Sequence, residues 1–429
     1  MLLLSGCLAI GSRAVWAQAL LDELITRDVA GVAAEPGVTV ASRERSEYSS
    51  LGVRVGNFMI RPELTESVGY TDNATATRDG RGSALIATSA ALRAQSNWSR
   101  HRLNAAVTVD DQRFLQESAQ SFTNWSASID GAYDIGRDTV TASYSHQNLT
   151  QTVRDLDVPQ LDESLAFRVD TGVVSYRATF NRLFAQPTLS VASYNFDNGT
   201  AGGVVYEQSY RNRVVVTPSI TLGYELAPRR NLVLVVRNAH GLYTDRPEDM
   251  VSRDFSDVAV LAGVDYDALA LLRFRVLAGY QNRSFRSDRY KTIQAPVVEA
   301  TAIWTPTTLV SLTGTVGRRV QDSADDATAA FTETAVRFVA DYEYTRNVLF
   351  QGRAELRSGD YSGSSGSQLL YRVGAGATVL LNRNMRLGAN YDFTGRRSNG
   401  NGNLGMFQNQ QFGSSYSENR FLLQLRLFL

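Results

Sequence analysis

The chain has 429 residues, of which 43% are hydrophobic, and its 43 Lys and Arg residues balance its 43 Asp and Glu residues. This balance argues against a basic nucleic-acid-binding surface. The single Cys excludes an internal disulfide framework, and the lack of any run of 18 apolar residues argues against a membrane-spanning helix. Average hydropathy says little about a transmembrane barrel, because polar and apolar residues alternate along its strands.

Residues 1–19 predict a secretory signal peptide, because a short apolar run ends in the small residues Ala17 and Ala19. The run has no charged start, which predicts that the true start of the signal lies upstream. Residues 4–7 also match a bacterial lipobox. Lipid attachment at Cys7 is therefore the alternative to its removal with the signal.

A mixed-charge stretch at residues 20–55 follows the signal, and only residues 20–29 within it have the pattern of a short amphipathic helix. We interpret the stretch as a periplasmic N-terminal segment. Plugging of a lumen is the alternative, although no motif supports it. Residues 56–429 are predicted to form one barrel domain.

The most specific motifs of the chain lie within residues 51–73. The first reads Leu-Gly-x-Arg-x-Gly-x-Phe-x-x-x-Pro from Leu51 to Pro62, and the second reads Gly-Tyr-x-Asp-Asn from Gly69 to Asn73. This opening resembles that of the putative beta-barrel porin type 2 family, and the likeness continues to the end of the chain as a series of strands. The resemblance implies an outer-membrane barrel of Gram-negative bacteria, with partners in the export of extracellular polysaccharide.

The hairpin at residues 334–356 shows the pattern that most of the chain repeats. Side chains alternate in a strand with period two, so Val336 and Phe338 share one face while Arg337 lies on the other. Each arm is long enough for the roughly nine to eleven residues of a bilayer-crossing strand, and longer than the roughly five or six typical of a soluble sandwich. The predicted fold is therefore all-β, a transmembrane antiparallel up-and-down barrel.

Connections of two lengths alternate along the chain. Eight short turns are expected near residues 97–100, 136–138, 181–183, 227–231, 267–270, 305–308, 345–347 and 382–384. Nine longer polar connections flank and separate them, near residues 71–82, 113–121, 151–163, 197–207, 244–253, 286–289, 321–330, 360–367 and 396–415. These connections predict about eighteen strands, with short periplasmic turns and longer extracellular loops.

Aromatic residues lie at or just before seven of the short turns, namely Trp98, Tyr133, Phe184, Tyr224, Tyr266, Trp304 and Tyr344. Rings that recur at one height predict a girdle at a membrane interface. The alternative is that they pack beneath the hairpin turns. A second belt is predicted at the loop ends, formed by Tyr70, Tyr144, Tyr194, Tyr243 and Tyr280.

The polar faces of the strands carry charges of both signs, and nine of these residues are candidates to line the lumen: Arg213, Arg273, Arg275, Arg337, Asp341, Glu343, Arg353, Glu355 and Arg372. Mixed signs predict weak charge selection. Guanidinium and carboxylate groups together also suit polar, glycan-like solutes. The alternative is that these charges pair with each other and brace the wall.

The sequence predicts no catalytic, cofactor or metal site, because His101, His146 and His240 lie far apart and lack metal-ligand spacing. His146, close to Ser143 and Ser145, is the one candidate for catalysis at an outer rim. No nucleophile motif supports it.

The expected function is a porin or channel for polar solutes in the bacterial outer membrane. The outer face would contact lipid and lipopolysaccharide, and the closing strand, which ends in Phe428 and Leu429, would contact the barrel-insertion machinery. One alternative is a non-conducting structural component of a polysaccharide-export assembly. Another is an outer-membrane hydrolase.

Overall fold

The computed structural model describes residues 39–158, 161–245, 251–267, 271–325, 328–361, 366–399 and 415–429. The predicted signal peptide with Cys7 and the amphipathic stretch at residues 20–29 lie outside these residues. Over the described ranges, no helix is both long and apolar enough to span a membrane.

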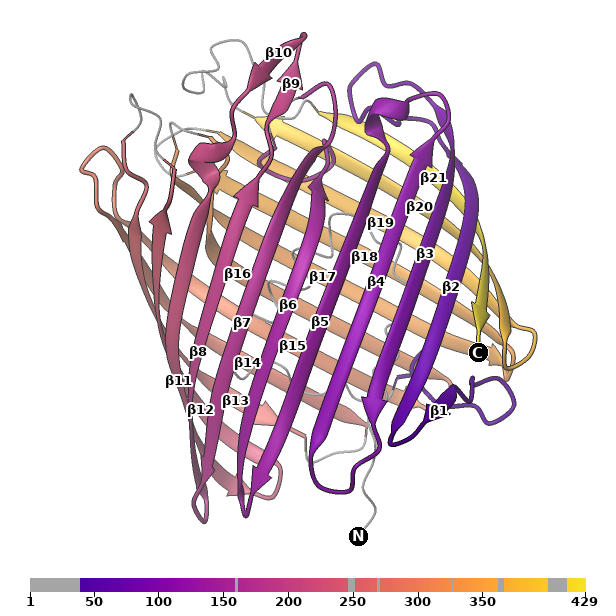
Figure 1. Ribbon diagram of the computed structural model, residues 1–429, viewed down its shortest axis with the longest axis vertical. Coiled ribbons are helices and arrows are strands. Elements are labelled where there is room, and N and C mark those ends of the chain that lie inside the picture. Colours follow the sequence, from indigo (N-terminus) through magenta and orange to yellow (C-terminus); the bar gives the residue numbers. More distant parts are fainter. Residues whose placement is uncertain are drawn as a thin grey trace.

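Eighteen antiparallel strands form one closed barrel, which confirms the predicted fold class (Figure 1). Each strand pairs with its neighbours in the sequence, and β21 pairs with β2 to close the cylinder. The barrel strands are β2 (Phe58–Thr71), β3 (Ser83–Ser96), β4 (Arg102–Phe114), β5 (Phe122–Ile135), β6 (Asp138–Gln151), β7 (Leu165–Thr179), β8 (Leu183–Phe196), β11 (Arg213–Ala227), β12 (Arg230–Tyr243), β13 (Phe255–Tyr266), β14 (Leu272–Phe285), β15 (Ile293–Thr307), β16 (Val310–Asp322), β17 (Ala330–Thr345), β18 (Val348–Tyr361), β19 (Ser367–Leu380), β20 (Met385–Asn399) and β21 (Tyr416–Phe428).

Five small elements complete the described structure. A short strand, β1, pairs with the beginning of β2, and β9 with β10 forms a hairpin in the connection between β8 and β11. The other two are single turns of 3₁₀ helix in long connections. Their bounds are β1 (Val53–Val55), η1 (Ser118–Gln120), β9 (Gly199–Ala201), β10 (Val204–Tyr206) and η2 (Ser209–Arg211).

Turn lengths alternate between the two ends of the barrel. Only Gly136 and Arg137 separate β5 from β6, and the left-handed backbone of Gly136, with a φ of 64°, allows this tight reversal. At the other end, connections such as residues 152–164 and 197–212 are far longer. Eighteen strands with this alternation bring both termini of the barrel to the short-turn end.

The apolar faces of the strands point outward. On β17, the exposed side chains of Val336 and Phe338 alternate with Arg337, and near the end of the strand Asp341 is buried while Tyr342 is exposed. Because polar side chains are enclosed and apolar ones are on the outside, the barrel has the reverse of the arrangement in a soluble protein.

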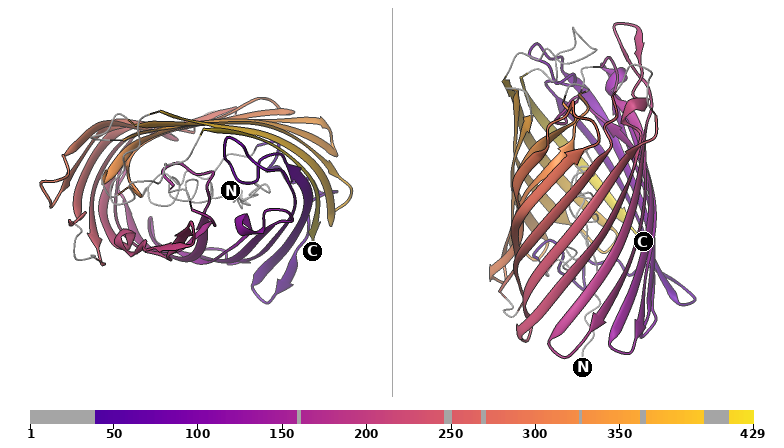
Figure 2. Two further views of the ribbon diagram at one scale, coloured as in Figure 1. Left: turned by 90° about the horizontal axis from the view of Figure 1, so that it is seen from above. Right: turned by 90° about the vertical axis from the view of Figure 1, so that its left-hand side faces the viewer.

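The barrel is oval rather than round, with strands around β12 and β13 at one narrow end (Figure 2). There the inner faces pack together, and buried Val235, Leu261 and Leu277 belong to one apolar cluster. The predicted apolar–polar alternation does not hold in this region, because both faces of these strands are apolar. The side chain of Arg237 on β12 donates hydrogen bonds of 2.6 and 2.9 Å to Glu299 on β15, which joins strands that are not neighbours.

Candidate functional site: the obstructed lumen

The nine charged residues singled out in the sequence lie on inward faces of β11, β14, β17, β18 and β19. Each of the six arginines forms an ion pair, although Arg213 Nε and Arg372 Nη1 lack hydrogen-bond geometry. The N–O distances are 2.9 Å for Arg213 and Asp322, 2.7 Å for Arg273 and Asp267, 3.7 Å for Arg275 and Asp265, 3.4 Å for Arg337 and Glu355, 2.5 Å for Arg353 and Asp392, and 3.9 Å for Arg372 and Glu355.

Several of these pairs connect strands rather than face open space. Arg353 on β18 reaches Asp392 on β20 by passing over Gly374 of the intervening strand β19. A Cβ atom at Gly374 would lie 2.3 Å from Asp392 Oδ1 and 2.7 Å from Arg353 Nε. The glycine therefore makes room for the pair. Such contacts favour the bracing alternative for the charged inner wall.

Two predicted lumen residues have other partners. Asp341 accepts hydrogen bonds from Gln351 Nε2 at 2.8 Å and from Ser311 Oγ at 3.3 Å. Glu343 accepts a hydrogen bond of 2.6 Å from Arg45, which precedes the barrel strands. Both carboxylates are therefore occupied by the protein itself.

In the connection between β6 and β7, residues 152–164, the described part at 152–158 folds into the outer end of the barrel. Thr152, Arg154, Asp157 and Val158 are buried. Hydrogen bonds join Asp157 to β19, Val153 to β20 and Arg154 to β21, and these strands belong to the opposite wall. The loop therefore crosses the lumen, an arrangement that no local sequence pattern had predicted.

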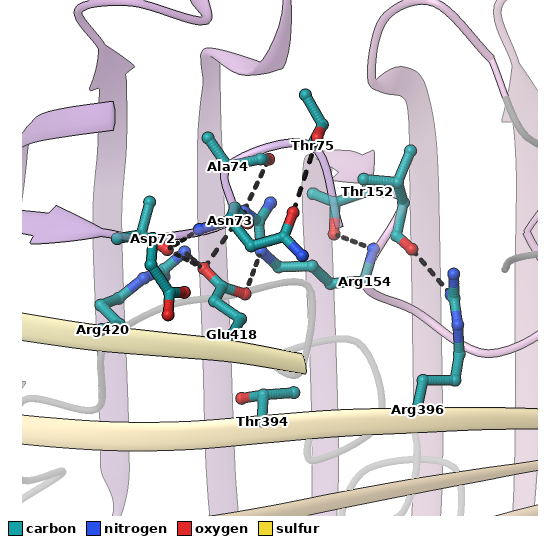
Figure 3. Close-up of polar contacts among 12 residues, drawn as sticks. Asp72, Asn73, Ala74, Thr75, Thr152, Arg154, Thr394, Arg396, Glu418 and Arg420 are labelled. Atoms are coloured by element: carbon teal, nitrogen blue, oxygen red, sulfur yellow. Dashed lines mark hydrogen bonds and ion pairs between the residues drawn. The ribbon is translucent and has the colours of Figure 1, made fainter. Parts of the chain in front are cut away.

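Arg154 fastens this loop to β21 (Figure 3). Its Nε donates to Glu418 Oε2 at 2.8 Å, and its Nη2 donates to the carbonyl of Ala74 at 2.7 Å. Thr71 and Arg420 also donate to Glu418, at 2.6 and 2.7 Å. Burial alone would lower the pKa of Arg154, but the Glu418 carboxylate raises it above its ordinary value, so the guanidinium is charged.

A second contact holds the loop backbone to β20. Arg396 Nη1 donates to the carbonyls of Val153 and Asp155, at 2.7 and 3.0 Å, and its guanidinium carbon lies 4.9 Å from the centre of the Tyr416 ring. Figure 3 shows Arg396 directed toward the loop from the strand below it. Backbone carbonyls that would be unsatisfied in a buried loop therefore find a donor on the wall.

Asp157 joins this loop to a second one, residues 323–329 between β16 and β17, of which 323–325 and 328–329 are described. Its carboxylate accepts hydrogen bonds from Ser323 Oγ at 2.9 Å and from the backbone N of Ala324, while its own backbone N donates to Gln368 Oε1 at 3.0 Å. Burial raises the pKa of Asp157 to about 7. Tyr210 completes the junction by donating to the carbonyl of Ala324 at 2.6 Å.

The aromatic residues at the outer end divide between the two faces of the wall. Tyr70, Tyr144 and Tyr280 are exposed on the outside, as predicted. Placing Tyr194 and Tyr243 in the same belt was wrong, because both are buried on the inner face, where the Arg213 guanidinium lies 4.3 Å from the centre of the Tyr194 ring. These two rings help to pack the outer end of the lumen.

Five of the seven aromatic residues near the short turns are strongly exposed, namely Trp98, Tyr133, Tyr224, Trp304 and Tyr344. Tyr266 stacks on Phe274 at the same end. Phe184 differs from them because its ring occupies the inward space above Gly223 and lies 3.8 Å from the guanidinium carbon of Arg177. It therefore does not belong to an outer girdle. The position of the other six at a membrane interface remains a prediction.

His146 faces the outside of the barrel, where its Nδ1 lies 2.7 Å from Asp170 Oδ1 and its ring packs against Trp125. Tyr144 also donates to Asp170, at 2.7 Å. In the described part of the chain, no Ser, Thr or Cys side chain hydrogen-bonds to His146, so the hydrolase alternative gains no nucleophile from this geometry. Across the same residues, no group of three or more His, Cys, Asp or Glu side chains is placed to hold a metal ion.

Comparison with known proteins identifies one family. The model of the family described as "Putative beta-barrel porin 2" matches residues 45–427. No curated protein matches the sequence significantly.

Similar solved structures include two Occ proteins and a transporter. OccK2 (OpdF) of Pseudomonas aeruginosa is 12% identical, with 86% of this chain and 98% of that chain covered and a TM-score of 0.45. OccAB3 of Acinetobacter baumannii is 9% identical, with coverage of 87% and 100% and a TM-score of 0.43. The FrpB iron transporter of Neisseria meningitidis is 8% identical, with coverage of 86% and 82% and a TM-score of 0.43.

Proposed function

We propose that this chain, which belongs to the "Putative beta-barrel porin 2" family and lies in the bacterial outer membrane, is a channel for small polar solutes. The observation that carries this proposal is the polar inner face of the closed barrel. Ion pairs line it on β17 to β21, and short hydroxyl pairs line it on the opposite wall. Examples of the latter are Thr108 with Ser126 at 2.7 Å and Thr141 with Ser175 at 2.6 Å.

The pairing of charges supports weak selection between anions and cations. The electric fields of an arginine and an adjacent carboxylate largely cancel, so the pair presents little net field to an ion in the lumen. Small hydroxyl side chains add donors and acceptors without charge. Such a surface suits neutral and polar solutes.

The infolded loops support a limit on solute size. The loops at residues 152–164 and 323–329 meet at Asp157 inside the outer end of the barrel. A solute therefore passes only through the space beside these loops, or after the loops move. The hydrogen bonds of Asp157 with Ser323 and Gln368 are buried, which supports a long-lived narrowing. The proposed substrates are therefore small.

Liposome swelling tests this proposal with three solutes of equal size: a neutral sugar, an organic anion and an organic cation. We expect uptake of all three, with rates that agree within about threefold because the wall charges cancel. The empty liposome and a heat-denatured sample are the controls. A preference for one charge sign of about tenfold or more would contradict weak selection.

The proposed affinity for glycan-like solutes has its own test. Replacing both Arg353 and Glu355 by Gln removes their charges while keeping hydrogen-bonding amides. If these residues bind sugar, uptake of an oligosaccharide relative to a small ion changes in the double variant. An unchanged ratio would show that the two residues only brace the wall.

A second candidate function is a non-conducting structural component of an export assembly, as the family resemblance implies. The specific observation that favours it is the contact network that obstructs the outer end of the barrel. Absence of uptake for every solute, in correctly folded protein, would support this candidate over the channel.

A further inference from the structure

The described chain begins inside the short-turn end of the barrel. The backbone N of Val40 donates to Ser311 Oγ at 3.0 Å, and Val40 is 1% exposed. Ser311 is fully buried on the inward face of β16, opposite Asp341 of β17 in the strand register. The segment at residues 39–50 therefore starts against the inner wall rather than in the space below the barrel.

Two arginines hold this segment to the next strands. Arg45 Nη2 donates to Glu343 Oε2 on β17 at 2.6 Å, and Arg43 Nη1 lies 3.5 Å from the same oxygen. Arg43 Nη2 also donates to the carbonyl of Thr308, in the turn before β16, at 2.5 Å. Glu343 is 8% exposed, so its carboxylate depends on these arginines for compensation of its charge.

The other end of the segment is fixed several strands away. Arg383, in the turn between β19 and β20, donates to the carbonyl of Ser46 at 2.9 Å, and Arg386 on β20 donates to the carbonyl of Tyr48 at 3.3 Å. Residues 39–50 thus follow the inner rim from β16 to β20. The chain then leaves the rim next to β21, where the backbone N of Gly52 donates to the carbonyl of Leu429 at 3.2 Å.

Internal hydrogen bonds give the segment a shape of its own. Arg43 N donates to the carbonyl of Thr39 at 3.0 Å, and Arg45 Nη2 donates to the carbonyl of Val40 at 3.0 Å. Arg45 therefore both closes the turn and contacts the wall. Loss of the Arg45–Glu343 pair would leave the buried Glu343 carboxylate with only the longer contact to Arg43.

We propose that residues 39–50 form a strap that narrows the periplasmic mouth of the channel and that the Arg45–Glu343 pair keeps the strap closed. This inference rests on the proposed channel function. It places a movable restriction at the end of the lumen opposite the infolded loops. Release of the pair widens the inner mouth while the barrel wall stays intact.

Single-channel recording with three variants tests the strap. Arg45→Glu and Glu343→Arg each replace attraction by repulsion, and we expect each to raise the conductance by about twofold, because the strap leaves the mouth. The double variant with both changes restores the attraction in reverse and should return the conductance to the parent value. Arg54→Glu is the matched control, since Arg54 is exposed on β1 and its side chain donates only to the carbonyl of Gly56.

A reversible cross-link provides an independent measurement. Val40→Cys with Ser311→Cys, in a Cys7→Ser background, puts thiols on the two residues that are joined by the hydrogen bond from Val40 N to Ser311 Oγ. Copper phenanthroline with oxygen removes two electrons and two protons to form the disulfide. The cross-linked protein then also carries Arg45→Glu. We expect its conductance to equal that of the parent while the disulfide is intact. Reduction of the disulfide with dithiothreitol should then raise the conductance.

The outcomes separate this inference from the proposed function. Equal conductance in the parent, Arg45→Glu, Glu343→Arg and the double variant would overturn the strap but not the channel function. A raised conductance in the cross-linked protein that also carries Arg45→Glu overturns the strap too. No conductance from any folded variant overturns the channel itself, and the strap with it. Conductance only after Arg45→Glu supports a strap that closes the mouth fully.

Discussion

Val216 and Thr217 are neighbours on β11 that face opposite sides of the wall. Val216 lies beside the exposed Val191 of β8, whereas Thr217 lies beside the buried Ser190. An arginine at the lipid-facing midplane costs roughly 2–4 kcal/mol, while one in a polar lumen costs little. We therefore expect Val216→Arg to reduce the refolding yield strongly and Thr217→Arg to leave it nearly unchanged. Equal yields for the two variants would contradict the assigned faces.

Asp157 makes docking of the loop at residues 152–164 depend on pH. Because burial raises its pKa to about 7, from 3.8, the docked loop holds a proton that the free loop releases at lower pH. Docking is therefore most favoured below the free pKa of 3.8 and weakens as the pH rises from there to about 7, by up to about 4 kcal/mol. Channel fluctuations should become more frequent as the pH rises from about 5.5 to about 7 and change little above it.

Asp157→Asn should remove this pH dependence. Asn tolerates the left-handed backbone at this position, where φ is 56°, and stays neutral at every pH. Asp162→Asn is the matched control, because it neutralises an exposed carboxylate in the same loop. A pH response that persists in Asp157→Asn and disappears in Asp162→Asn would show that another group is responsible.

At the scale of elements, a buried ion pair is one of the contacts that hold the infolded loop. Arg154→Gln removes the loop's cation from Glu418, which then keeps only Arg420 and Thr71 as donors, and breaking a buried pair costs at most roughly 3–5 kcal/mol. We expect a larger and noisier conductance in this variant. Arg168→Gln is the control, since its side chain and that of its partner Asp197, 3.7 Å away, are both about half exposed and such pairs contribute about 1 kcal/mol or less. Identical recordings from both variants would contradict the role of Arg154.

The two ends of the barrel differ enough to test its orientation. An epitope tag inserted between Gly202 and Gly203, at the tip of the β9–β10 hairpin, should bind antibody on intact cells. A tag inserted between Gly136 and Arg137, in the short turn between β5 and β6, should bind only after the outer membrane is opened. The reverse labelling would refute the expected orientation.

The strands were predictable because their signal is local and repeated. In β17, the alternation of Val336, Arg337 and Phe338 is visible within three residues, and the same period recurs through the chain. The same alternation, followed along β8, would have placed Tyr194 on the inner face. Leu189 and Val191 face outward, and Tyr194 is an odd number of residues away from both. The error came from reading aromatic residues at strand ends without following the strand.

The obstruction of the lumen was not predictable from such patterns. Arg154 and Glu418 are 264 residues apart, and Val40 and Ser311 are 271 apart. Nothing near either partner indicates the other. The only local signal is apolar content in a connecting loop, where Leu156 is buried although it lies between strands.

At the scale of the whole molecule, a polar lumen lies between two restrictions of different origin. Loops between strands close in from one end, and the segment that precedes the barrel lies along the rim of the other. The wall between them is braced by ion pairs and by the apolar cluster of Val235, Leu261 and Leu277 at the narrow end of the barrel. In the proposed channel, we therefore expect conduction to depend on whether these two segments move while the barrel stays folded.

The most direct test of the channel is single-channel recording of refolded protein in planar bilayers, with a variant in which residues 153–163 are replaced by a short Gly-Ser linker. Shifted gel mobility on heating verifies that both proteins are folded. We predict discrete conductance steps for the parent and larger steps for the variant, because the loop that crosses the lumen is gone. Absence of steps from both folded proteins would contradict a conducting lumen and favour a structural role.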